Sequence, residues 1–435
     1  MSSPSPAVYV EGADTSVFAK ATWRLLPFLF VCYLFAYLDR INVAFAKLQM
    51  LSDLGFSEAV YGFGASVFFI GYLLFEVPSN LLLLRVGPRR WIARIMVTWG
   101  LISAGMMFVK TPTAFYVMRF LLGVAEAGFF PAIVLYLTYW FPASRRSKVT
   151  ALFLTGIPMS GVIGGPLSGW IMTVFNGSHG FAGWQWLFLM EGIPTALLGV
   201  VAFFYLDDKV RDAKWLSEGQ KDCLEQSLKE EASSNALHSV RDGLLNPKVL
   251  LVSIIYFFYT MGLYGVSFWL PTLIKASGVS DPLNVGLLTS VPYAAGAIAM
   301  LFVSGSSDRT GERRWHLIVP GLVGAVGLAL SVWFANSTLL AMIALTLGTM
   351  GVMTTISQFW VLPPAFLGGA AAAAGLALAN SVGSISGVVS PSLIGLIKTA
   401  TGSAGAGVLG LSVSLVIGGL LVLLVPAALV NVRRK

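Results

Sequence analysis

The stretch Tyr33-Leu-Phe-Ala-Tyr-Leu-Asp39-Arg40-Ile-Asn42-Val-Ala-Phe-Ala46 places an acid and a base side by side inside an otherwise apolar sequence. A charge at the centre of a membrane helix costs about 2.5–3.5 kcal/mol even on the lenient insertion scale. Such a residue is kept only where it has a partner or faces a water-filled cavity. We therefore expect Asp39 and Arg40 to lie on a pathway through a membrane.

Composition supports a membrane protein. Of the 435 residues, 56% are hydrophobic and only 11% are charged, so a soluble fold would have no way to bury its apolar surface. The net charge of +8 comes from short basic runs between apolar segments. This pattern is typical of topology signals and argues against nucleic-acid binding.

Other function classes lack their signals. Cys32 and Cys223 lie in different contexts and the three histidines are scattered, so we expect neither a disulfide framework nor a metal site. No phosphate-binding loop ends in Gly-Lys-Ser/Thr, and no nucleophile with its base is legible. We therefore expect no cofactor, no metal and no enzymatic activity. The polar first twenty residues lack the features of a cleavable signal peptide.

Twelve apolar windows match the ~20 residues that cross ~30 Å of hydrocarbon. They predict an all-α membrane protein with twelve transmembrane helices in two six-helix bundles. Glycines at 161, 164, 165 and 169 predict close helix approach in the fifth span. The expected spans are 22–46, 59–84, 91–109, 113–141, 148–175, 185–206, 248–275, 285–304, 316–335, 339–362, 369–396 and 404–430.

The distribution of Lys and Arg predicts the orientation. Segments on the N-terminal side of the membrane hold 22 of the 28 bases, and the opposite side holds 4. This bias predicts that both termini are cytoplasmic. We also expect a monomer in a cell membrane, namely a bacterial inner membrane. The predicted division is an N-terminal tail 1–21, a first bundle 22–206, a cytoplasmic linker 207–247, a second bundle 248–430 and a tail 431–435.

The linker allows two interpretations. Its apolar residues recur at near-helical spacing, which is compatible with an amphipathic surface helix. The alternative is a solvated spacer that only fixes the distance between the bundles. The apolar residues in question are Trp215, Leu216, Cys223, Leu224 and Leu228.

Two basic, glycine-containing loops occupy matching positions in the two halves. Arg85-Val-Gly87-Pro-Arg89 follows the second span, and Asp308-Arg309-Thr-Gly311 follows the eighth. Duplicated six-helix units would show this echo. The chain here resembles the major facilitator superfamily, although Asn80 and Leu84 stand where its first loop has glycine and aspartate, and Ser304 replaces the first glycine of the second loop. The loops either gate the halves by charge pairing or only hold the topology.

A finer resemblance covers nearly the whole chain. The motifs are Asp39-Arg40-Ile-Asn42, Phe75-Glu76-Val-Pro78-Ser-Asn80, Arg119 to Pro131, and 370–375 leading to Asn380-Ser381. Together they resemble the anion:cation symporter branch, which includes bacterial carriers of tartrate, phthalate, hydroxyphenylacetate and sugar acids. The resemblance implies that Arg40 contacts the anion and that Asp39 and Glu126 handle protons. It also implies substrate contacts from Tyr37, Tyr72, Ser357, Gln358, Trp360 and Asn380, although helix packing is an equal alternative for Ser357 and Gln358.

Helix geometry supports the same charged residues. Arg119 and Glu126 are seven residues apart, two turns on one face of the fourth span, at a depth similar to that of Asp39 and Arg40. They either form a static ion-pair cluster or couple protons to an anion. Arg119 is a second candidate for substrate binding. Glu76 and Glu191 precede prolines and are expected to hold kinks.

The hypothesis from the sequence is uptake of a small organic carboxylate with protons by alternating access. A planar guanidinium suits bidentate binding of a carboxylate. An exchanger, facilitator or exporter on the same fold is the alternative, and a channel would need a continuous polar lining instead. The identity of the carboxylate, the coupling ion and the direction of transport stay open.

Overall fold

The computed structural model describes residues 11–234, 246–360, 362 and 369–431, and these residues contain twelve helices long and apolar enough to cross a membrane. The predicted number of spans and the all-α fold are confirmed. The helices of the first half are α1 (Glu11–Leu54), α2 (Glu58–Val86), α3 (Pro88–Gly105), α4 (Pro112–Glu126), α5 (Phe129–Thr138), α6 (Ala143–Leu154), α7 (Gly156–Val174) and α8 (Gly183–Tyr205). Those of the second half are α11 (Pro247–Ala276), α12 (Pro282–Thr310), α13 (Trp315–Trp333), α14 (Thr338–Phe359), α15 (Gly369–Thr401), α16 (Gly405–Leu423) and the short α17 (Ala427–Val430).

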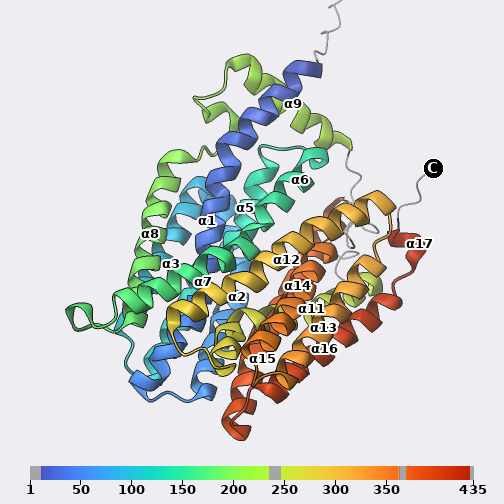
Figure 1. Ribbon diagram of the computed structural model, residues 1–435. Helices are drawn as coiled ribbons and strands as arrows, with labels where there is room; N and C mark the ends of the chain where they lie inside the picture. The colour runs from blue at the N-terminus through green and yellow to red at the C-terminus, as the bar shows by residue number, and fades with distance from the viewer. Residues whose placement is uncertain (1–10, 235–245, 361, 363–368, 432–435) are drawn as a thin grey trace, which may run out of the picture.

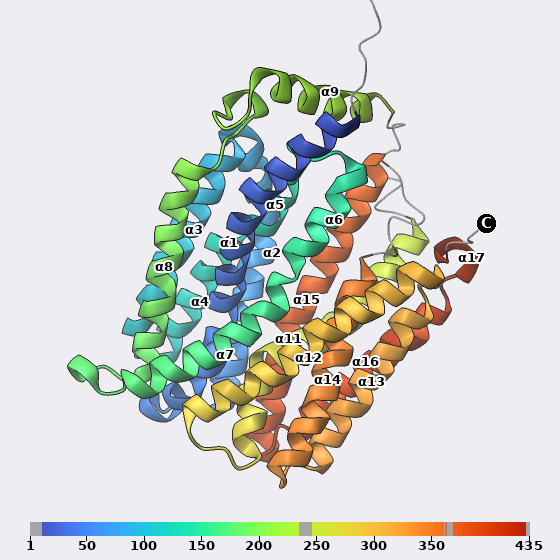
Figure 2. The same cartoon turned by 45° about the horizontal axis from the view of Figure 1, so that its top comes forward.

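The helices form two bundles that lean against each other (Figure 1). In the first, α3 packs on α8, α2 on α4, and α1 on α7 and α8; in the second, α13 packs on α14 and α16. Two pairs join the bundles along their length, α2 with α15 and α7 with α12 (Figure 2). Large apolar side chains cover the outer faces; Trp333 is 84% and Phe204 78% exposed, as a lipid-facing surface requires.

Turn chemistry sets several helix ends. Ser57 caps α2, Thr111 caps α4, and Asp281 caps α12 by accepting the backbone N–H of Asn284 at 2.9 Å. The predicted fourth span is broken, because Gly128 has φ +85° and separates α4 from α5 directly after Glu126. Glycine takes this conformation without strain. The break leaves Glu126 in the last turn of α4.

One end of the interface between the bundles is tied by charge. The Glu58 carboxylate on α2 bonds Lys398 Nζ of α15 at 2.5 Å and Lys47 Nζ of α1 at 2.6 Å. Lys47 Nζ also lies 3.6 Å from the centre of the Trp269 ring on α11, a cation–π contact across the bundles. We call this the Glu58 end. The opposite end, where α9 (Glu218–Ser234) meets the start of α1, is the linker end.

The linker is packed on the first bundle. Trp215 stacks on Trp140 with ring centres 5.4 Å apart, and Leu216 and Leu224 are buried. Arg211 bonds Asp222 and Glu225 of α9. The amphipathic helix is therefore present, but it begins after Trp215 and Leu216, and the idea of a spacer that is solvated throughout is wrong for this segment.

Candidate functional site

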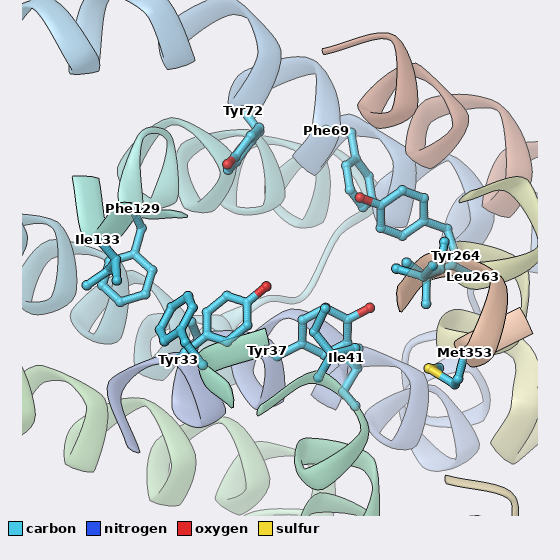
Figure 3. Packing of buried hydrophobic residues seen from close by; sticks show 14 of the residues in the cluster. Tyr33, Tyr37, Ile41, Phe69, Tyr72, Phe129, Ile133, Leu263, Tyr264 and Met353 are labelled. Atoms are coloured by element: carbon cyan, nitrogen blue, oxygen red, sulfur yellow. The ribbon is translucent and has the colours of Figure 1, made fainter. Parts of the chain in front are cut away.

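A cavity lies between the two bundles, with about 610 Å³ of space that protein atoms do not fill, part of it open to solvent. On α1 its lining residues precede Lys47, so the cavity lies on the linker side of the Glu58 tie. Four tyrosines, Tyr33, Tyr37, Tyr72 and Tyr264, surround this space (Figure 3). The other lining residues are Arg40, Phe69, Phe130, Leu154, Ile157, Tyr256, Leu263, Ile356, Trp360, Asn380 and Ser384.

Among the described residues that line the cavity, Arg40 is the one with a cationic side chain. Its Nη2 donates to Glu126 Oε1, and its side chain is 14% exposed while that of Glu126 is 1% exposed. The guanidinium also lies 5.4 Å from the ring centre of Tyr37 and 5.7 Å from that of Tyr72. Arg40 Nε and Glu126 Oε2 have no hydrogen-bond partner. The pair therefore keeps one donor and one acceptor that are buried without a hydrogen-bond partner.

Asp39 points away from the cavity into the first bundle. Trp99 Nε1 and Thr195 Oγ1 donate to Asp39 Oδ2 at 2.8 and 2.7 Å, and Ser103 Oγ donates to Oδ1 at 3.0 Å. Consecutive helical residues project about 100° apart, so the neighbours Asp39 and Arg40 serve different surroundings. Of the two residues expected on a pathway through the membrane, Arg40 lines the cavity and Asp39 does not.

Arg119 is separated from the cavity as well. It is fully buried, its Nε donates to Gly64 O at 3.3 Å, and neither Nη1 nor Nη2 has a hydrogen-bond partner. Its guanidinium lies 5.0 Å from the ring centre of Phe68, and that of Arg40 lies 5.4 Å from the same ring. Phe68 thus stands beside both cations.

The predicted residues of the second bundle separate into two groups. Trp360 and Asn380 line the cavity, and Trp360 packs edge-on to Tyr256 at 5.1 Å. Asn380 Nδ2 also donates to Glu76 Oε1 of α2 at 3.0 Å, which gives Glu76 a partner in the other bundle. Ser357 and Gln358 instead bond Ser304 of α12, at 3.3 and 2.7 Å, in helix packing.

The two basic loops are bonded within their own halves. Asp208, from the start of the linker, accepts the backbone N–H of Arg89 at 2.9 Å and lies 2.9 Å from where a Cβ on Gly87 would stand. The acid that the first loop lacks is thus supplied by Asp208. In the second loop Asp308 bonds Arg313 at 2.7 Å, and Gly311 ends α12 with φ +72°. Arg85 and Arg309 lie at the last turns of α2 and α12.

Glu312 follows in the second loop. Burial alone would raise the pKa of Glu312, but the backbone N–H groups of Trp315 and His316 and the His316 ring outweigh it and hold the pKa below its ordinary value. Asn431 Nδ2 donates to Glu312 Oε1 at 3.5 Å. This hydrogen bond connects the second loop to the segment that follows α17.

Sequence reasoning missed several residues of the cavity, among them Tyr33, Tyr256, Tyr264 and Ser384. A signal existed for Tyr33, which lies four residues before Tyr37 and so on the same helix face. The Glu58 tie was missed because its partners are far apart in sequence. Among the described residues no group of three His, Cys, Asp or Glu side chains could hold a metal ion.

A mid-membrane cavity between two similar bundles, tied at one end, is the architecture of a secondary membrane transporter. The comparisons with known proteins agree. The family model of the Major Facilitator Superfamily matches residues 29–391, and the chain belongs to this family. It is thus a transporter and a multi-pass membrane protein, not an enzyme.

Close relatives cover almost the whole chain. It is 48% identical to the putative metabolite transport protein NicT of Pseudomonas putida over 97% of both chains. It is 47% identical to a putative tartrate transporter of Agrobacterium vitis over 94% of both. Among solved structures, a partially occluded inward-open form of the xylose transporter XylE from E. coli shares the fold, with a TM-score of 0.74 at 14% identity, over 93% of this chain and 99% of that one.

Proposed function

We propose that this transporter takes up a small organic carboxylate together with protons by alternating access. The observation that carries the proposal is Arg40, a guanidinium exposed at a mid-membrane cavity and paired with a single acid, Glu126. A planar guanidinium binds carboxylates bidentately. The relatives named as putative tartrate transporters support an organic anion as substrate.

Coupling follows from competition for Arg40. A substrate carboxylate that bonds Arg40 displaces Glu126, and a buried carboxylate without its cation takes a proton from water. The neutral site can then reorient, and deprotonation on the other side restores the pair and releases the substrate. In this scheme Glu126 carries the coupled proton, and Tyr37, Tyr72, Trp360 and Asn380 contact the substrate. Arg119, Ser357 and Gln358 act through packing.

The orientation belongs to the same proposal. With both termini and the linker cytoplasmic, in a bacterial inner membrane, the Glu58 tie closes the outer side and the cavity belongs to an inward-facing state. The loops of Arg85, Gly87 and Arg89 and of Asp308, Arg309 and Gly311 would meet when the inner side closes. The carrier works as a monomer, because each chain contains a complete cavity.

Purified protein in proteoliposomes tests the proposal. A panel of tartrate, phthalate, hydroxyphenylacetate, nicotinate and sugar acids should include a substrate that accumulates under an inward proton gradient. Glu126→Gln should abolish accumulation of that substrate and spare its exchange across the membrane. Accumulation at the normal rate in Glu126→Gln would refute the role of Glu126 as the proton carrier. Uptake by the wild type at a rate independent of the pH gradient would favour an exchanger or facilitator.

A further inference from the structure

A second pair of carboxyl groups lies inside the first bundle, apart from the cavity. Glu191 on α8 and Asp39 on α1 are each 1% exposed. Asn42, one turn beyond Asp39, donates its Nδ2 to Asp39 Oδ1 at 3.3 Å and also lies beside the Glu191 carboxyl group. Thr195, one turn beyond Glu191, donates to Asp39 Oδ2. The two carboxyl groups therefore share one polar site between α1 and α8.

The two carboxyl groups differ in their hydrogen bonds. Asp39 is fully provided with donors, as an ionised carboxylate requires, because four side chains donate to it: Asn42, Trp99, Ser103 and Thr195. Among the described residues, Glu191 accepts the Ser168 hydroxyl on Oε1 at 2.9 Å, and the Asn42 side chain is its other polar neighbour. Glu191 Oε2 and Asn42 Oδ1 are buried acceptors without any partner. A proton on Glu191 Oε2 would provide the missing donor for Asn42 Oδ1.

No cation balances the pair. Among the described residues neither Asp39 nor Glu191 has an ion-pair partner, because α3 presents Trp99 and Ser103 and α7 presents Ser168. Arg40 is directed to Glu126, which is the next acid and adds further negative charge near Asp39. In a low-dielectric interior, the negative charge of one carboxylate disfavours ionisation of the other, so the pair binds a proton more tightly than an isolated carboxyl group would. A metal cation is disfavoured because the oxygens of Asp39 already accept hydrogen bonds.

We propose that Glu191 binds an exchangeable proton and forms, with Asn42 and Asp39, a second proton site inside the first bundle. This inference rests on the proposed proton-coupled transport. Binding forms an O–H bond at Glu191 Oε2 that donates to Asn42 Oδ1, and release returns the proton to water. The released state leaves two negative carboxylates on either side of Asn42. Their repulsion favours a wider separation of α1 from α8, which links the proton to the shape of the bundle.

Infrared difference spectroscopy of the purified full-length protein in lipid nanodiscs tests this inference directly. A protonated buried carboxyl group has a C=O stretching band that an ionised one lacks. The wild type should show this band at neutral pH and lose it reversibly as the pH is raised. Glu191→Gln should remove the band, whereas Glu126→Gln should keep it. Ser168→Ala should shift its frequency without removing it, because only the hydrogen bond to Oε1 is lost.

Two results would overturn the inference. The band of Glu191→Gln could equal that of the wild type, which would place the proton elsewhere. Alternatively, the band could persist at every pH at which the protein stays folded, which would make the proton a fixed part of the structure. The measurement needs no transported substrate. A negative uptake assay therefore does not contradict the proton site at Glu191. A negative infrared result likewise does not contradict the coupling scheme of Arg40 and Glu126.

Discussion

Neutralising Glu58 should open the Glu58 end. Of its two ion pairs, only the one to Lys398 joins the bundles, since Lys47 and Glu58 both belong to the first half. The Lys398 and Glu58 side chains are 21% and 24% exposed, so this charge-assisted bond stands at the low end of ~1.5–3 kcal/mol. Glu58→Gln also leaves Lys47 and Lys398 facing each other without a counter-ion. The population that is open at the Glu58 end should therefore rise roughly tenfold, since about 1.4 kcal/mol is a factor of ten.

The assay is labelling of a cysteine in the cavity by a membrane-impermeant maleimide added from the Glu58 side. Ser384→Cys, in a background with Cys32→Ala and Cys223→Ser, places the reporter on the cavity wall. Its labelling rate should rise about tenfold with Glu58→Gln. Asp53→Asn is the matched control, because Asp53 bonds Trp184 within the first half. Equal labelling with and without Glu58→Gln would refute the view that this ion pair holds the end closed.

Three further predictions follow from other parts of the structure. Arg40→Lys keeps the positive charge that pairs with Glu126 but loses the planar guanidinium that binds a carboxylate with two hydrogen bonds. The KM for the transported carboxylate should therefore rise at least about tenfold. An unchanged KM would mean that the anion binds elsewhere. Gly123→Ala should lower the free energy of unfolding of the detergent-solubilised protein by about 1–3 kcal/mol, because the new Cβ would lie 1.9 Å from the carbonyl oxygen of Phe68. Gly305→Ala is the control, because no atom lies within 4 Å of the position of its Cβ. At pH values above 4.5, the ordinary pKa of a glutamate, ionised Glu312 stabilises the folded state. This contribution is lost as the pH falls through the lower pKa that Glu312 has in the folded protein. As the pH is lowered from 4.5 through the folded pKa, the melting temperature of the wild type should thus fall more steeply than that of Glu312→Gln. Parallel curves over this range would contradict the low pKa.

The fold could be predicted from the sequence because the patterns that indicate it are local. Apolar length predicts each span, and the two basic loops mark corresponding points of the two halves. The break at Gly128 also had a signal in Gly128-Phe-Phe-Pro131, yet the apolar run from 113 to 141 concealed it.

The site was only partly predictable, for geometric reasons. The cost of burying charge identified Arg40 and Glu126 as residues that need partners, and the structure pairs them. The same cost applied to Asp39, but charge alone does not say which way a side chain points. Donors on α3 and α8, namely Trp99, Ser103 and Thr195, bind Asp39 inside the first bundle. Glu58 and Lys398 are 340 residues apart, so no local pattern could join them.

The contact of α7 with α12 has a consequence for how the substrate specificity of such a carrier can change. A Cβ at Gly165 would lie 2.6 Å from Gly286 O, and one at Gly286 would lie 2.2 Å from Gly165 O. Main chain therefore packs directly against main chain here, and neither glycine lines the cavity. Substitutions around Trp360 and Tyr256 can therefore change which solute the cavity accepts without altering the packing of α7 on α12.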